Sequence, residues 1–360
     1  MKLRPVIWAA AGLCIAIFLV SKIYLSRSPK DYIRFQRARA EREESRLQPI
    51  RQFMKDKINR QVPPALGSIA IAILLGDQKD MPFEVRQSFS KSGTAHLLAI
   101  SGGNIALVAV SLIVIFRLLS VPRRWTYALS IAFLAFYCAL TGAASSILRA
   151  TIMVSIYLAG FLFRREPEIL TSLAWAAILI LLYDPLQFYD LGFQLSFISV
   201  FMIGASSEGW EEVEPEASPN AFQKARIYLE NSVVVSLAAW AGVTPLIASV
   251  FGMITPVTIF ANLVLVPYFS ILQIAGFLFL ALGSLSVWLE EIFGISLYLL
   301  CRGALFLSDW FVSWPFSHFY IRPPENLEII VFYAAILIWT FRVQIKEKFS
   351  IWRQGHATAG

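Results

Sequence analysis

The stretch from Val257 to Leu282 decides the fold; it reads VTIFANLVLVPYFSILQIAGFLFLAL and carries no charged side chain. About 20 mostly apolar residues in a helix cross the ~30 Å hydrocarbon core of a bilayer, so this segment is long enough to span a membrane. The same rule predicts roughly ten spans in the whole chain. The others are the N-terminal run Pro5–Val20 and the segments Ala95–Phe116, Thr126–Leu140, Ala144–Phe163, Ile169–Tyr183, Leu191–Ala205, Ser232–Phe251, Leu285–Leu307 and Leu327–Phe341.

Composition agrees with a membrane protein, because 57% of the 360 residues are hydrophobic, only 15% are charged, and the mean hydropathy is +0.64. Soluble domains average about 45–50% apolar and roughly 25% charged residues. We therefore expect an all-α, polytopic integral membrane bundle. The cysteines and histidines are too scattered for a disulfide framework or a metal site, so we expect no metal, no cofactor and no enzyme activity. These residues are Cys14, Cys138, Cys301, His96, His318 and His356.

The N-terminal part divides into an anchor helix (1–25) and a basic segment (26–63). Lys2 and Arg4 precede an apolar run without a clear cleavage site, which predicts an uncleaved signal anchor. Residues 26–62 hold eleven basic and five acidic side chains. An apolar stripe within this segment predicts an amphipathic helix on the membrane surface. The stripe consists of Ile50, Phe53, Met54, Ile58 and Val62.

The next apolar stretch, Ala65–Gly76, is short for a span and predicts a re-entrant segment. A re-entrant segment puts the basic residues 26–62 outside the cell, whereas a full crossing puts them inside, as the bias of Lys and Arg toward the cytoplasm favours. We expect a channel domain over 64–310, interrupted by one long polar loop, Ser206–Glu230. A last span and a basic cytoplasmic tail then occupy 311–360.

Polar residues inside spans are the informative ones, because they survive in lipid only where they face protein or water. His96 and Ser101-Gly102-Gly103-Asn104 lie at the start of one span. Glycines loosen a helix, and a broken helix is a common way to build a transport site. Close packing of helices through small residues is the alternative.

Arg149 lies in the first third of an otherwise apolar span, where a charge costs about 2.5–3.5 kcal/mol. Either this guanidinium lines an aqueous path and meets phosphates, or it reaches the interface or pairs with carbonyls. Further along the chain, Asp190 is expected to be a helix N-cap. Gln194 and Ser196, just inside the following span, bond a neighbouring helix or face a pore.

Two prolines, Pro245 and Pro267, lie within adjacent apolar spans and predict kinks with freed carbonyls. Asn262 and Gln273 add polar groups to the second of these spans. Both amides are therefore candidates for the same polar path.

Together these motifs resemble the ComEC-type competence family, the membrane channels of natural transformation. The resemblance covers about Pro64 to Leu307. It rests on HLLAISG at His96–Gly102, G-x-x-S-x-x-R-A at Gly142–Ala150, D-x-GFQLSF at Asp190–Phe197, and TP…FG…ANL…P at Thr244–Pro267.

The resemblance implies a multi-pass channel in a bacterial inner membrane that translocates single-stranded DNA inward during DNA uptake. By this analogy the path residues are His96, Ser101, Gly102, Asn104, Arg149, Gln194, Ser196, Asn262 and Gln273. Larger family members also have an OB-like domain and a metallo-β-lactamase-like domain with an HxHxDH motif. The basic segment stands where the OB-like domain would be, and this chain has no HxHxDH motif. It also has Gly103-Asn104 where the family usually has Leu-His.

We therefore expect single-stranded DNA and membrane lipids as partners, with a cytoplasmic ATPase motor, a separate nuclease and a DNA receptor as further candidates. No G-x-x-x-x-G-K-[ST] loop is present in the sequence, so an ATP-driven step needs another protein. A transporter or lipid-handling protein on the same scaffold is the alternative function. A membrane scaffold for other proteins is a third hypothesis.

Overall fold

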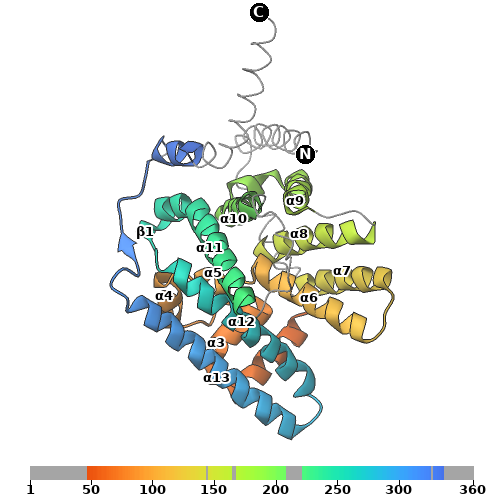
Figure 1. Cartoon of the computed structure of the whole chain (residues 1–360). Helices are drawn as coiled ribbons and strands as arrows, with labels where there is room; N and C mark the ends of the chain where they lie inside the picture. Colours follow the sequence, from red (N-terminus) through yellow and green to blue (C-terminus); the bar gives the residue numbers. More distant parts are fainter. Residues whose placement is uncertain (1–46, 143–144, 164–167, 208–220, 326, 336–360) are drawn as a thin grey trace, which may run out of the picture.

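The computed structural model describes residues 47–142, 145–163, 168–207, 221–325 and 327–335 (Figure 1). Within these ranges the regular elements are helices apart from a short antiparallel pair of strands, which confirms the all-α expectation. The elements are a helix at 47–61, α3 (Pro64–Leu75), α4 (Phe83–Lys91), α5 (Ala95–Leu98), α6 (Gly102–Leu118), α7 (Arg123–Leu140), α8 (Ser145–Leu162), α9 (Ile169–Tyr183), the 3-10 helix η1 (Pro185–Tyr189), α10 (Leu191–Ser207), α11 (Ala221–Phe251), β1 (Met253–Ile254), α12 (Thr258–Leu282), α13 (Val287–Val312), β2 (Phe319–Tyr320) and a helix at 327–335.

Three described helices are long and apolar enough to cross a membrane, namely residues Arg226–Phe251 of α11, α12 and α13. Other apolar helices are shorter, and one of 17 residues is only about 26 Å long. We expected about ten spans, but in the described part only these three helices have the length and composition of a span. The predicted span Ala95–Phe116 is divided into α5 and α6, and the anchor 1–25 lies outside the described residues.

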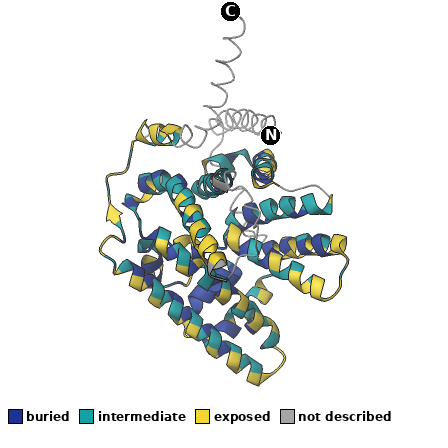
Figure 2. Cartoon of the chain, viewed as in Figure 1, coloured by how far each residue is buried: buried dark blue, intermediate teal, exposed yellow. Residues whose placement is uncertain are grey.

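The short helix α3 lies at the centre of the largest core. All nine residues from Gly67 to Leu75 are buried, and α12 and α13 pack against them. Figure 2 shows this burial and exposed residues along α6, α7 and α13. Large apolar residues are among those exposed on these three helices. Leu74 fits against the bare backbone of Gly276 in α12, where a Cβ would lie 2.5 Å from its side chain. A helix that is apolar on all sides is typical of a protein core or a membrane span, and here other helices of the protein enclose it.

The helix at 47–61 is present, but its expected apolar stripe is divided. Ile58 and Val62 are fully buried in the same core as α3, whereas Ile50 and Phe53 are exposed. Lys57 is buried as well, and its Nζ donates a hydrogen bond of 2.7 Å to Ser284 Oγ at the end of α12. The C-terminal half of this helix therefore packs into the protein interior, and its place on a membrane surface stays a prediction.

A second core joins α6, α7 and α8, and a small cluster joins α9 to α10. The prediction of a polar loop over Ser206–Glu230 is wrong at its C-terminal end, because helix α11 already begins at Ala221. An ion pair of 2.7 Å between Arg226 and Glu230, one turn apart, stabilises this added part of the helix. Cys138 and Cys301 are buried and form no disulfide, as expected of small apolar core residues, and Cys14 lies outside the described residues.

Candidate functional site: a broken helix and a buried arginine

The predicted break lies directly before Gly102. Helix α5 ends at Leu98, Ala99 and Ser101 have extended backbones, and α6 then begins with Gly102. His96 and Gly102 are exposed, and a Cβ added to Gly102 would have no atom within 4 Å. The start of α6 therefore opens onto space that the described side chains do not fill.

Two of the predicted amide residues, Gln273 and Asn104, are in contact at the start of α6. Gln273 of α12 is 1% exposed, and its Nε2 donates a 3.4 Å hydrogen bond to the backbone oxygen of Asn104 in the first turn of α6. Asn104 Oδ1 accepts an equally long bond from Ser101 Oγ. Its Nδ2 is buried without a partner among the described residues. Bonds of 3.4 Å are weak, so this group retains unused donor capacity.

Arg149 is buried inside the protein, with 3% of its surface exposed. Its guanidinium is enclosed by the protein, so in this structure it does not extend into solvent. Instead its Nη1 donates to Asp190 Oδ1 at 3.1 Å, while its Nε has no partner within the described ranges. Asp190 also accepts the backbone N–H of Phe193 at 2.8 Å, which confirms its role as N-cap of α10.

The other predicted residues are more dispersed. Gln194 donates to the backbone oxygen of Phe188 at 3.0 Å, so it bonds the neighbouring 3-10 helix. Ser196 is half-buried, and Asn262 Oδ1 is buried with no partner in the part of the chain that is described. Pro245 and Pro267 lie inside continuous helices, so a kink at either stays a prediction.

The broken helix and the start of α8 meet at Gly76, directly after α3. A Cβ at Gly76 would lie 3.0 Å from Ile147 and 3.4 Å from Ile100. Ile100 is in the break, and Ile147 is two residues before Arg149. No hydrogen bond or ion pair among the described residues joins Arg149 to Asn104, so the two polar groups are separate and only the apolar residues around Gly76 link their helices.

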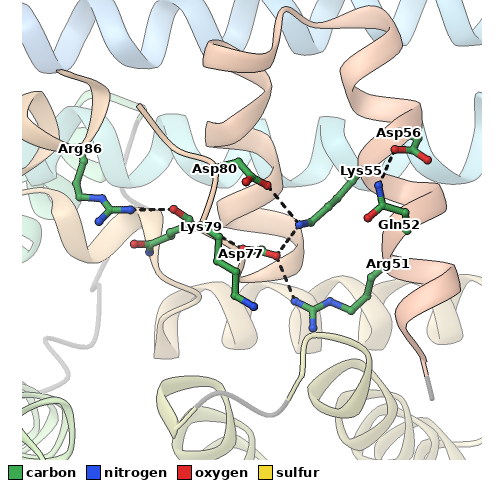
Figure 3. Close-up of polar contacts among 9 residues, drawn as sticks. Arg51, Gln52, Lys55, Asp56, Asp77, Lys79, Asp80 and Arg86 are labelled. Carbon is green, nitrogen blue, oxygen red and sulfur yellow. Dashed lines mark hydrogen bonds and ion pairs between the residues drawn. The ribbon is translucent and has the colours of Figure 1, made fainter. Parts of the chain in front are cut away.

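An ion-pair cluster that we did not predict from the sequence lies next to Gly76 (Figure 3). Asp77 is 2.6 Å from Lys55 Nζ and 3.8 Å from Arg51 Nη2, both on the helix at 47–61. Burial tends to raise the pKa of Asp77, but hydrogen bonds from Lys55 and the Lys79 backbone and the two positive charges lower it overall. Arg51 also covers Gly142, so this cluster ties the N-terminal helix to the turn before α8.

A second unpredicted feature is a chain of hydroxyl groups that positions α5. Ser88 Oγ lies 2.6 Å from Asp309 Oδ1 and 2.8 Å from Ser308 Oγ. Ser92 Oγ is 3.1 Å from Ser308 Oγ and 2.7 Å from Thr94 Oγ1. The four hydroxyls are buried, and Thr94 directly precedes α5. The chain therefore fixes the entry to the broken helix against α13.

These groups supply hydrogen-bond donors and one buried positive charge, which suit a polar, anionic ligand. Among the described residues no group of three or more His, Cys, Asp or Glu side chains is placed to hold a metal ion. Sequence reasoning found Arg149 and Asp190 separately, but it did not pair them. The available signal was a buried charge that needed an acidic partner.

Comparison with known proteins places these motifs in a family. Residues 73–346 match the family described as Competence protein. The chain is 31% identical over 239 residues to ComE operon protein 3 of Bacillus subtilis (strain 168), which covers 65% of this chain and 29% of that protein. It is also 31% identical over 221 residues to an uncharacterized protein of Aquifex aeolicus (strain VF5), covering 61% of this chain and 49% of that protein.

The chain thus spans less than half the length of either curated relative. No solved structure matches it. The family match includes the broken helix, the buried arginine and the capped start of α10, which are the features on which the resemblance was based. With most of its length matched, this chain belongs to the Competence protein family.

Proposed function

We propose that this chain is a channel that translocates single-stranded DNA across the bacterial plasma membrane during DNA uptake, as a multi-pass protein. Membership of the Competence protein family and three helices of membrane-spanning length support this role. The observation that carries the proposal is Arg149, a buried guanidinium whose Nε has no partner among the described residues. A buried charge that is only partly paired is costly, which is typical of a functional position.

The chemistry of a DNA strand suits this arrangement. Each nucleotide carries one negative phosphate, and the planar donor fork of arginine matches phosphate oxygens. Asn104 and Gln273 add neutral amides that bond bases or phosphates without holding them by charge. Conduction requires binding that is strong enough for entry and weak enough for release. A single cation that already has a carboxylate partner, with neutral amides at a separate place in the chain, meets this need.

In this proposal the chain transports and does not catalyse. A cytoplasmic ATPase motor, a nuclease and a DNA receptor are separate proteins, and membrane lipids solvate the exposed apolar faces. A lipid-handling protein is the competing function, because a guanidinium also binds lipid phosphates.

The test is Arg149→Gln in a naturally transformable host whose only copy of the gene carries the change. We expect cytosolic uptake of labelled DNA to fall at least tenfold, since glutamine keeps a polar side chain but loses the charge. DNA uptake should fall less in Arg149→Lys, because lysine keeps the positive charge but lacks the planar donor fork of arginine. Arg302→Gln is the matched control, since Arg302 is exposed on α13 and bonds only Tyr298 in the described structure.

Protein levels in the membrane fraction are measured in parallel. Uptake that is unchanged in Arg149→Gln at normal protein levels would contradict the proposal. Purified chain in liposomes that moves labelled lipids but binds no oligonucleotide would favour the lipid-handling function instead.

A further inference from the structure

The pairing of Arg149 with Asp190 is incomplete on both sides. Arginine and carboxylate commonly form two parallel hydrogen bonds, but here only Nη1 and Oδ1 are in contact, at 3.1 Å. Asp190 Oδ1 is shared with the backbone N–H of Phe193, and Oδ2 makes no hydrogen bond with the described residues. The side chain of Asp190 is 46% exposed, whereas that of Arg149 is 4% exposed.

This pair lies at the N-terminus of α10, which is a 17-residue helix. The first N–H groups of a helix lack partners inside the helix and favour negative charge. A Cβ at Gly192, in the first turn, would lie 2.8 Å from Arg149 Nη2. The guanidinium therefore lies directly over the first turn, and glycine leaves room for it.

Arg149 and the first turn of α10 together have the features of an anion site: a buried positive charge, an unpartnered Nε and helix N–H groups. Asp190 now occupies that site with its own carboxylate. This carboxylate is half-exposed, and only Oδ1 is engaged, with Arg149 Nη1 and the Phe193 N–H. It can therefore rotate toward water by giving up these two bonds, without uncovering a core.

We infer that Asp190 is a built-in competitor at a phosphodiester-binding site formed by Arg149 and the start of α10, and that each passing phosphate exchanges with its carboxylate. This inference rests on the proposed function, since it names how the transported strand is held and released. Without the competitor, a phosphate would stay on the buried guanidinium and slow the strand. With it, Arg149 is never left without a negative partner, and release is fast.

The test compares Asp190→Asn and Asp190→Ser with the unaltered full chain in nanodiscs of neutral lipid. Asparagine and serine both keep an N-cap oxygen for Phe193 and remove the charge. A fluorescent single-stranded oligo-dT is the binding probe. We expect both variants to bind it five- to tenfold more tightly, and to show lower DNA uptake in cells because release is slower.

Two further measurements identify the contact. Arg149→Gln combined with Asp190→Asn should cancel the gain in affinity, and an oligonucleotide with a neutral methylphosphonate backbone should show no gain. Asp184→Asn is the matched control, because Asp184 caps the 3-10 helix η1 by accepting the N–H of Leu186. Its oligonucleotide affinity should equal that of the unaltered chain.

The outcomes separate this inference from the proposed function. If Arg149→Gln weakens binding but neither Asp190 variant strengthens it, the competitor role is wrong and the channel proposal stands. If Arg149→Gln changes neither binding nor uptake, both are wrong. An equal gain with the neutral backbone would also overturn the inference, because the contact would then not involve phosphate charge.

Discussion

Substitution of Gly93 by alanine should be among the most damaging small changes in this protein. Gly93 lies between Ser92 and Thr94 of the hydroxyl chain and has a φ of +72°, a conformation that L-residues rarely adopt. A Cβ at this position would lie 1.6 Å from Thr258 Oγ1 and 2.6 Å from Thr255 Oγ1. Real Cβ atoms essentially never approach another atom within 3.0 Å, so α12 or the turn before α5 must move.

The magnitude follows from two contributions. The left-handed backbone costs an alanine roughly 1–2 kcal/mol, and overpacking of a closed site costs about 1–3 kcal/mol. Gly93→Ala should therefore lower the free energy of unfolding by about 2–5 kcal/mol, a large part of the ~5–15 kcal/mol of a typical protein. Adding Thr258→Ala removes the closest clash but not the backbone strain. The double variant should recover about half of the loss.

The assay is denaturant unfolding of the purified full chain in mixed micelles, followed by tryptophan fluorescence. Gly102→Ala is the matched control at the other end of α5, because a Cβ there has no atom within 4 Å. It should stay within about 0.5 kcal/mol of the unaltered chain. Two results would refute the reasoning. One is a Gly93→Ala loss of unfolding free energy as small as that of Gly102→Ala. The other is a double variant whose loss equals the sum of the Gly93→Ala and Thr258→Ala losses.

Two other changes test the contacts around the site. Asp77→Asn should destabilise the chain by about 1–3 kcal/mol at neutral pH, measured by the same unfolding assay. Because folding lowers the pKa of Asp77, its contribution is complete above the ordinary value of 3.8 and is lost as pH falls through the folded-state pKa. The variant should therefore show a smaller loss of stability on acidification, and an unchanged acid profile would contradict the ion-pair assignment. Ser308→Ala should lower the free energy of unfolding by about 1–3 kcal/mol, because it interrupts the hydroxyl chain. The exposed Ser313→Ala is the control and should cost less than about 0.5 kcal/mol. Equal effects would show that the hydroxyl chain adds no stability.

Local sequence signals predicted the parts of this structure that depend on near neighbours. The glycines at 102 and 103 located the break in the helix, and the aspartate at 190 located the start of α10. Helix lengths were less predictable, because a run of apolar residues does not show where a turn interrupts it. The division of Ala95–Phe116 into α5 and α6 is the clearest case.

Long-range pairing was not predictable from one sequence. Ser88 and Ser308 are 220 positions apart, and serines give no sequence signal that they will meet. Arg149 and Asp190 are 41 positions apart, and the cap role of the aspartate was sufficient reason for its presence. The N-terminal helix was expected to lie on the membrane surface through its apolar stripe, and no local pattern indicated that Lys55 on its basic face pairs with Asp77. In each case the partner is fixed by helix packing rather than by local pattern.

The central claim is that a DNA strand passes the open start of α6. The most direct test places the photo-crosslinking residue benzoylphenylalanine at Gly102, where the surrounding space accepts a large side chain, in cells that take up labelled DNA. The matched position is Phe133, which is 41% exposed on α7. We predict adducts with the labelled strand at position 102 and none at position 133. Adducts with lipid alone at position 102, or no difference between the two positions, would contradict the account.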